Sequence, residues 1–141
     1  MKKTYLLAIT FVVLFGFSGC GEDEQSNVAV NFVKALTELN IESAKELSSK
    51  DNSLYSLEII CSMDKKSSSD EKKESYIDSE CLSTYTPYAK VEDIDVVETI
   101  NKDDDNSMVE LELVYSNNET RTVKLELKKE NEKWKVTNPA F

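Results

Sequence analysis

The sequence of 141 residues contains no histidine. This absence excludes Ser–His and Cys–His nucleophile pairs, imidazole metal ligands and the usual general base near neutral pH. A pair of carboxylates could still provide acid–base catalysis, but no motif marks such a pair. We therefore expect a protein that is not an enzyme and that carries no cofactor.

The chain also lacks an apolar run long enough to cross a membrane. Its longest run, residues 5–17, is shorter than the roughly 20 residues that a spanning helix needs. Lys2 and Lys3 precede this run, and small residues stand just before Cys20. This order is typical of a secretory signal peptide, and the cysteine at the cut resembles the lipobox of bacterial lipoproteins, in which the thiol is acylated. The alternatives are a cleaved signal peptide without lipid and an uncleaved anchor.

The resemblance to a lipoprotein predicts how the chain is divided and where it resides. We expect a signal peptide over residues 1–19, a lipidated tether over residues 20–25 and a single domain over residues 26–141. Cys20 would hold the protein to the membrane of a bacterial cell envelope. Gly21, rather than Asp, follows the cysteine, which by resemblance to enteric bacteria favours the outer membrane, facing the periplasm.

Besides Cys20, the sequence has only two cysteines, Cys61 and Cys81. No further thiol or imidazole is present to complete a zinc shell around them. An exported chain meets an oxidising compartment, so we predict a disulfide bond between these two residues. It would close a loop of about twenty residues and contribute roughly 3 kcal/mol of stability.

Basic residues are fewer than acidic ones, and the formal net charge is -10. Nucleic-acid binding depends on Lys and Arg contacts to phosphate, so we expect no nucleic-acid partner. A basic protein partner or a solvated acidic surface suits this charge better. The acidic stretch that starts at Asp103 does not fit a calcium-binding EF-hand, because Met108 and Val114 occupy the positions that need glycine and an acidic ligand.

The first half of the mature chain has helical periodicity. Ser26 is a candidate N-cap for a helix that ends near Leu39, and Asn40 either ends this helix or caps the next one, residues 41–47. The apolar positions Leu54, Leu57, Ile60 and Cys61 suit a third, short helix. Residues 64–75 contain no apolar side chain and predict a loop. Residues 76–84 fit either a helix or a loop.

From Tyr88 onwards the apolar period changes to two, which predicts strands. Residues 89–100 predict one strand with a bulge, because the apolar phase slips between Val91 and Ile94. Three further alternating segments follow, with these apolar positions: Val109, Leu111, Leu113 and Tyr115; Val123, Leu125 and Leu127; Trp134 and Val136.

The apolar faces of these strands constrain the turns between them. Directly opposed residues must share a face, so the second loop must hold an odd number of residues and the third an even number. We predict a three-residue loop at residues 117–119. The predicted cross-strand neighbours are Leu113 with Val123, Leu111 with Leu125, Glu112 with Lys124, Leu127 with Trp134, and Leu125 with Val136.

Three short motifs carry a family resemblance. They are Val-Asn-Phe-Val-Lys-Ala-Leu at residues 30–36, Ile-Glu-Ser-Ala-Lys-Glu-Leu at residues 41–47, and Glu-Lys-Trp-Lys-Val at residues 132–136. Together with the lipobox, they resemble small bacterial lipoproteins with a domain of unknown function in the nuclear transport factor 2-like, cystatin-like superfamily. The resemblance implies an α+β fold, in which an N-terminal helical hairpin packs on a curved antiparallel sheet of three to four strands around a cone-shaped cavity. The candidate pocket-lining residues are Phe32, Leu36, Leu111, Leu113, Tyr115 and Trp134.

These observations predict a membrane-anchored, non-catalytic lipoprotein that binds a small apolar ligand or a basic protein partner. The alternative is an inhibitor of a cationic envelope-directed enzyme such as lysozyme, which the acidic charge and the disulfide would suit. An enzyme that uses buried carboxylates is the third possibility. Some members of the superfamily use an Asp–His pair, but the absent histidine means that no catalytic residue carries over.

Overall fold

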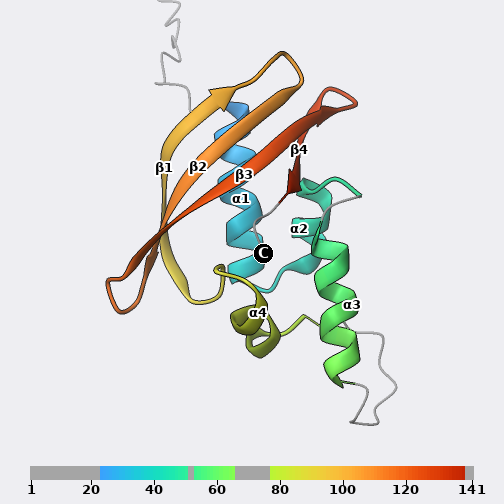
Figure 1. Cartoon of the computed structure of the whole chain (residues 1–141), viewed down its shortest axis with the longest axis vertical. Helices are drawn as coiled ribbons and strands as arrows, with labels where there is room; N and C mark the ends of the chain where they lie inside the picture. Colours follow the sequence, from blue (N-terminus) through green and yellow to red (C-terminus); the bar gives the residue numbers. More distant parts are fainter. Residues whose placement is uncertain (1–22, 51–52, 66–76, 139–141) are drawn as a thin grey trace, which may run out of the picture.

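A computed structural model describes residues 23–50, 53–65 and 77–138 of the chain. Within these ranges, four helices precede four strands (Figure 1). The predicted signal peptide and Cys20 lie outside the described residues, as does most of the predicted loop at residues 64–75. In the part that is described, no helix is both long enough and apolar enough to traverse a bilayer. The elements are α1 (Glu24–Thr37), α2 (Ile41–Leu47), α3 (Ser53–Lys65), α4 (Ser79–Tyr85), β1 (Val91–Asn101), β2 (Asn106–Tyr115), β3 (Thr120–Glu130) and β4 (Lys133–Asn138).

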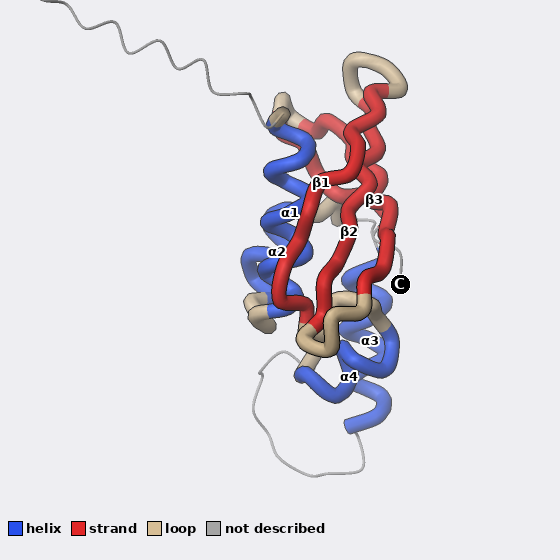
Figure 2. The backbone as a smooth tube through the Cα atoms, turned by 90° about the vertical axis from the view of Figure 1, so that its left-hand side faces the viewer, coloured by secondary structure: helices blue, strands red, loops and turns tan. Residues whose placement is uncertain are grey.

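The four strands form one antiparallel sheet in the order β1-β2-β3-β4. Helix α1 crosses one face of this sheet and contacts all four strands, and α2 lies on the same side (Figure 2). Helices α3 and α4 lie at one end of the molecule. The predicted α+β class, with a helical hairpin packed on a four-stranded antiparallel sheet, is confirmed.

Helix α1 connects the two ends of the sheet. Near its start, the Gln25 side chain donates to Asn101 Oδ1 at 2.9 Å, where β1 ends. At its other end, Thr37 Oγ1 donates to the Tyr88 carbonyl at 2.8 Å, just before β1 begins. The helix therefore runs antiparallel to β1 along the whole strand.

The N-cap of α1 differs from the prediction. Asp23 caps the helix by accepting from the Ser26 backbone N–H at 3.0 Å, and α1 begins at Glu24. The folded domain thus starts before the predicted boundary at residue 26. A carboxylate at the cap position accepts a charge-assisted hydrogen bond, and it leaves Glu24 in the first turn, where the helix dipole favours negative charge.

Asn40 has both of the roles that the sequence left open. Its N–H donates to the Ala35 carbonyl at 2.7 Å, and the N–H of Leu39 donates to the Leu36 carbonyl at 3.0 Å, which together close α1 with a Schellman motif. Leu39 has φ of 57°, the left-handed conformation that this motif requires. The Asn40 side chain then accepts from the Ser43 N–H and caps α2.

The loop between β2 and β3 holds an odd number of residues, as predicted, but the cross-strand register differs from the predicted one by two residues. Leu113 faces Arg121 and Leu111 faces Val123, rather than Val123 and Leu125. The Tyr115 N–H donates to the Glu119 carbonyl at 3.0 Å, so the three-residue loop spans residues 116–118. Asn118 has φ of 60° and occupies the left-handed position of such a loop. A shift of two keeps every side chain on its face, so the apolar pattern does not select between the two registers.

The hairpin between β3 and β4 shows the same kind of difference. Its loop holds an even number of residues, as predicted. Leu127, however, is opposite Val136 instead of Trp134, and Trp134 is opposite Lys129. Asn131 and Glu132 form the two-residue loop with φ of 50° and 63°. Two consecutive positive φ values indicate the type I′ turn that suits the twist of a hairpin.

Strand β1 contains the predicted bulge between Val91 and Asp93 and a second one between Val96 and Glu98. The second bulge changes which side chains face the helices. Beyond this bulge Thr99 is opposite the buried Val109, so Ile100 turns to the outer face and is 37% exposed, although the sequence pattern placed it on the apolar face. Val96 remains opposite Leu111, on the helix-facing side, but is 39% exposed in this edge strand.

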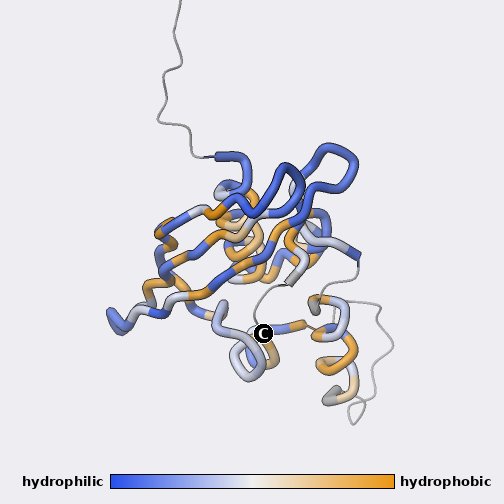
Figure 3. Tube along the Cα trace, turned by 45° about the horizontal axis from the view of Figure 1, so that its top comes forward, coloured by the Kyte–Doolittle hydropathy of each residue, from blue (hydrophilic) through white to orange (hydrophobic). Residues whose placement is uncertain are grey.

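The hydrophobic core lies between the helices and the sheet (Figure 3). The rings of Phe32 on α1 and Tyr88 meet edge to face, with centroids 6.4 Å apart. The largest of the fully buried side chains are Tyr88, Phe32, Leu36, Leu54, Leu57, Leu82, Leu111, Leu113, Leu125, Leu127, Val33 and Val109.

Helices α3 and α4 are joined by the Cys61–Cys81 disulfide that the sequence predicts. Helix α3 has 13 residues, more than the short helix expected, and Ile60 on it is 40% exposed. The ambiguous stretch at residues 76–84 contributes most of α4, which Asp78 caps by accepting from the Cys81 N–H at 2.9 Å. The disulfide therefore fixes α4 to a helix that is anchored in the core by Leu54 and Leu57.

Candidate ligand-binding groove

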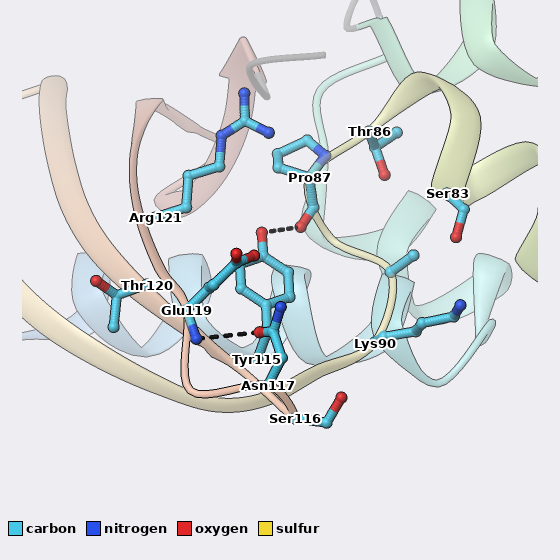
Figure 4. A pocket seen from close by; sticks show the side chains of 11 residues that line it. Ser83, Thr86, Pro87, Lys90, Tyr115, Ser116, Asn117, Glu119, Thr120 and Arg121 are labelled. Atoms are coloured by element: carbon cyan, nitrogen blue, oxygen red, sulfur yellow. Dashed lines mark hydrogen bonds between the residues drawn. The ribbon is translucent and has the colours of Figure 1, made fainter.

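A groove lies at the end of the molecule where α1 terminates. It consists of two adjoining cavities of about 740 and 500 Å³, which share Ser83, Thr86, Pro87 and Arg121 in their linings. We call it the α4–β3 groove. One wall is residues 83–90, from α4 to the start of β1, and the other is residues 115–124, from the end of β2 into β3 (Figure 4).

The first wall is held in place by hydrogen bonds from three directions. The Tyr115 hydroxyl donates to the Pro87 carbonyl at 2.5 Å, which joins this wall to β2. Thr37 on α1 donates to the Tyr88 carbonyl, and the Thr86 hydroxyl donates to the Leu82 carbonyl of α4 at 2.9 Å. These contacts preorganise the wall, so a ligand would meet a groove that is already formed.

Arg121 occupies the second wall because of strand alternation. Its position on β3 has the same parity as the buried Val123 and Leu125, so its side chain lies on the helix-facing side of the sheet. The core ends before this position, and Arg121 is exposed. In Figure 4 its guanidinium extends across the groove toward Pro87.

The groove gathers positive charge in an acidic protein. Arg121 is the single arginine of a chain with a net charge of -10. Lys90 and Lys124 also line the groove, and Glu119 is its one carboxylate. Lys124 is paired with Glu110 at 3.1 Å, whereas Arg121 makes no ion pair with any residue in the described ranges. The groove therefore favours a ligand that carries negative charge.

Tyr115 has a structural role in the groove. Burial raises the pKa of its phenol, and the positive charge of Arg121 opposes that rise without cancelling it. At neutral pH the hydroxyl is thus protonated and donates to Pro87. A phenol that is engaged in this way supports the wall of the groove and is not placed to act as a general base.

The second wall also contains a strand edge that is paired on one side only. Within the described residues, β4 pairs with β3 from Glu126 to Glu130, so residues 120–125 pair with β2 alone. Tyr115 and Glu119 form a hydrogen-bonded pair, and such pairs alternate with non-bonded pairs in antiparallel sheets. The backbone N–H and C=O groups of Thr120, Thr122 and Lys124 consequently point away from β2.

Only one of the six predicted pocket-lining residues lies in the groove. Tyr115 lines it, whereas Phe32, Leu36, Leu111 and Leu113 have 0% exposure and fill the core. Trp134 is also buried, with Lys129 Nζ 5.7 Å from its ring centroid. Sequence reasoning did not find Arg121, Lys90 or Thr86. The available signal was a lone arginine at the start of an amphipathic strand.

The acidic turn around Asp103 is a structural feature. The Asp103 carboxylate accepts hydrogen bonds from the Asp105 N–H at 2.9 Å and from the Asn106 amide at 2.8 Å. These hydrogen bonds, the one from Asp105 first, lower the pKa of Asp103. Across the residues that the structure describes, no group of His, Cys, Asp and Glu is arranged to hold a metal ion.

This chain is similar to a family of proteins and to solved structures. The family model described as "Domain of unknown function (DUF4878)" matches residues 18–137. A crystal structure from Campylobacter jejuni, provisionally named an NTF2-like transpeptidase, is 18% identical with a TM-score of 0.50, and the match covers 79% of this chain and 95% of that one. An NTF2-like protein of unknown function from Shewanella oneidensis MR-1 is 11% identical with a TM-score of 0.44, over 82% of this chain and 93% of that one. A comparison with curated proteins finds no significant match.

Proposed function

The chain belongs to the family described as a domain of unknown function (DUF4878) and has an NTF2-like fold, and from this premise we propose that it is a binding module rather than an enzyme. The ligand occupies the α4–β3 groove. The observation that carries this proposal is a preorganised groove of ligand size, lined by hydroxyl, amide and cationic side chains. The Campylobacter jejuni protein shares the fold at 18% identity, and its transpeptidase name is not transferred to this chain.

Binding without catalysis is supported by the residues of the groove. The sequence has no histidine, and the Tyr115 hydroxyl is engaged by Pro87. Glu119 stands alone, without a second carboxylate in the lining. General acid–base catalysis by carboxylates usually needs two such groups with separated pKa values.

The character of the lining also separates the candidate ligands. An apolar ligand would leave Arg121 and Lys90 without partners, whereas an anionic ligand would pair with them. The alternative role, inhibition of a cationic enzyme, rests on the net charge of -10. It has less support because the groove presents cations to an incoming partner.

We further propose that a lipid on Cys20 tethers this module to the bacterial cell envelope. The order of charged start, apolar core and small residues before Cys20 supports this. Metabolic labelling with palmitate should tag the protein in the source cells, and Cys20→Ala should abolish the label. An unlabelled wild-type protein would contradict the tether and would leave the groove proposal intact.

Hydrogen–deuterium exchange of the full-length chain in detergent tests the groove. The probes are inorganic phosphate, N-acetylglucosamine, and short peptides of glutamate or of lysine. We expect at least one probe to slow exchange in residues 83–90 and 115–124, and Arg121→Gln to weaken that protection. Lys133→Gln, which removes an exposed charge at the start of β4 beside the far end of β3, should have no effect. Protection confined to other regions, or none with any probe, would refute the proposal.

A further inference from the structure

Within the described residues, the edge of β3 over residues 120–125 has no strand beside it, and this edge indicates what kind of ligand fits the groove. Thr120, Thr122 and Lys124 each present one N–H and one C=O away from β2. Edge groups of this kind are ready to pair with another strand, and proteins commonly protect long free edges. Here the edge is flanked by the wall of residues 83–87, which leaves a cavity of about 500 Å³ beside it.

The length of this edge matches a short strand. Six residues, 120–125, lie beyond the reach of β4, and at about 3.3 Å per residue they extend roughly 20 Å. Typical strands have five or six residues. The next residue after β4 in the sequence is Pro139, which has no N–H to donate to β3. An incoming segment would lie beside β3, in line with β4.

The charges along the edge select the side chains of that segment. Arg121 lies on the helix-facing side of β3, and Lys124, three residues further along the strand, lies on the opposite, outer side. A strand laid along this edge would place alternate side chains beside each of them. Acidic side chains would pair with Arg121, and basic ones would be repelled.

We propose that the α4–β3 groove binds an extended acidic peptide segment, which pairs with residues 120–125 of β3 as an added strand in line with β4. This inference rests on the proposed function and names its ligand class. Main-chain hydrogen bonds provide affinity, and Arg121 provides selectivity for acidic side chains. The Ser83 hydroxyl, which makes no hydrogen bond within the described residues, faces the peptide from the opposite wall.

Fluorescence anisotropy with labelled six-residue peptides tests this directly. The probes are an alternating Thr–Glu peptide, an alternating Thr–Lys peptide, and two Thr–Glu peptides that are N-methylated at every second residue, one in each phase. We expect the full-length chain to bind the Thr–Glu peptide at least about ten-fold more tightly than the Thr–Lys peptide. One of the two N-methylated peptides should bind about ten-fold or more weakly than the unmethylated peptide, because its methyl groups replace the N–H groups that donate to β3.

Matched variants separate the backbone from the side chains. Thr122→Pro removes an edge N–H and should reduce affinity about ten-fold, whereas Thr122→Ala keeps that N–H and should bind more tightly than Thr122→Pro. Arg121→Glu should reverse the preference for glutamate over lysine, and Lys133→Glu should preserve it. Circular dichroism checks that Thr122→Pro folds, and the N-methylated peptides test the same bonds without any protein variant.

Two outcomes would overturn this inference. The first is equal affinity for the Thr–Glu and Thr–Lys peptides, and the second is undiminished binding of both N-methylated peptides. If phosphate or N-acetylglucosamine protects the groove in the exchange experiment while no peptide binds, the strand-addition inference fails and the binding function stands. If no probe protects the groove, both fail.

Discussion

Breaking the Cys61–Cys81 disulfide is the perturbation whose effect the structure predicts most directly. The two cysteines are separated by 20 residues and join α3 to α4. Closing a loop of that length restricts the unfolded chain, and the loop-entropy relation gives about 3 kcal/mol at 25 °C. The loss is a large share of the 5–15 kcal/mol that typically stabilises a domain. Reduction keeps both sulfur atoms, so it changes the packing around the buried Cys61 less than substitution does.

The assay is urea denaturation with and without a reductant, followed by the fluorescence of Trp134. This is the single tryptophan of the chain, and its side chain is 6% exposed in the core. Global unfolding should therefore change its emission. We expect reduction to lower the free energy of unfolding by about 3 kcal/mol. A Cys20→Ala background removes the third thiol from the experiment.

The control is a Cys61→Ala, Cys81→Ala double variant, which should be destabilised without reductant and insensitive to its addition. Hydrogen exchange should also increase more in α4 than in β2, because α4 is held by the disulfide and β2 is paired on both sides. A change below about 1 kcal/mol on reduction would refute the loop-entropy argument. Unchanged protection in α4 would refute the claim that the disulfide holds the first wall of the groove.

Three smaller effects should also be measurable by denaturation. Asp23→Ala should lower the free energy of unfolding by about 1 kcal/mol at pH 7, because the cap to Ser26 is lost. Burial raises the pKa of Asp23, but the hydrogen bonds from Ser26 outweigh burial and lower the pKa overall. The stability difference from the wild type should therefore persist to pH 3.8 and vanish only as the pH falls further. Tyr115→Phe should lower the free energy of unfolding by about 1 kcal/mol, because it removes the hydrogen bond to Pro87. Since burial raises the pKa of Tyr115, the stability difference should hold at neutral pH and shrink only above pH 10.0. A stability difference that stays constant up to pH 12 would contradict this reasoning. Glu132→Gly should raise the free energy of unfolding by about 0.5–1 kcal/mol. Glu132 has φ of 63° in the turn, and glycine adopts that conformation without steric cost. Unchanged or lower stability would count against the type I′ assignment.

Alternation of apolar residues predicts which face each strand buries, and it therefore predicts the parity of both hairpin loops. It does not predict their register, because a shift of two residues preserves every face. The register is decided by which residues adopt positive φ. Asn118 and Asn131 do so in the structure, and asparagine is the non-glycine residue that tolerates this conformation best. Asn131 marks the second turn in the sequence, whereas the adjacent Asn117 and Asn118 fit the first turn equally well by residue type.

The groove was harder to predict than the sheet. Its first wall follows α4, whose position depends on the disulfide and on the contacts of Pro87 and Tyr88 with residues far away in the sequence. The resemblance correctly implied a fold with α1 across a curved sheet. It placed the pocket among Phe32, Leu111 and their neighbours, but these apolar side chains pack against each other, because burying them is the main source of stability.

The direction of α1 sets how the module would stand on the envelope. Cys20 precedes the Asp23 cap by three residues, a reach of at most about 10 Å. With an acyl group on that sulfur, the start of α1 and the neighbouring β1–β2 hairpin sit nearest the lipid headgroups. The 14 residues of the helix then carry its far end about 21 Å outward. The mouth between Ser83 and Arg121 opens at this outer end, so a soluble polypeptide could dock there without touching the bilayer.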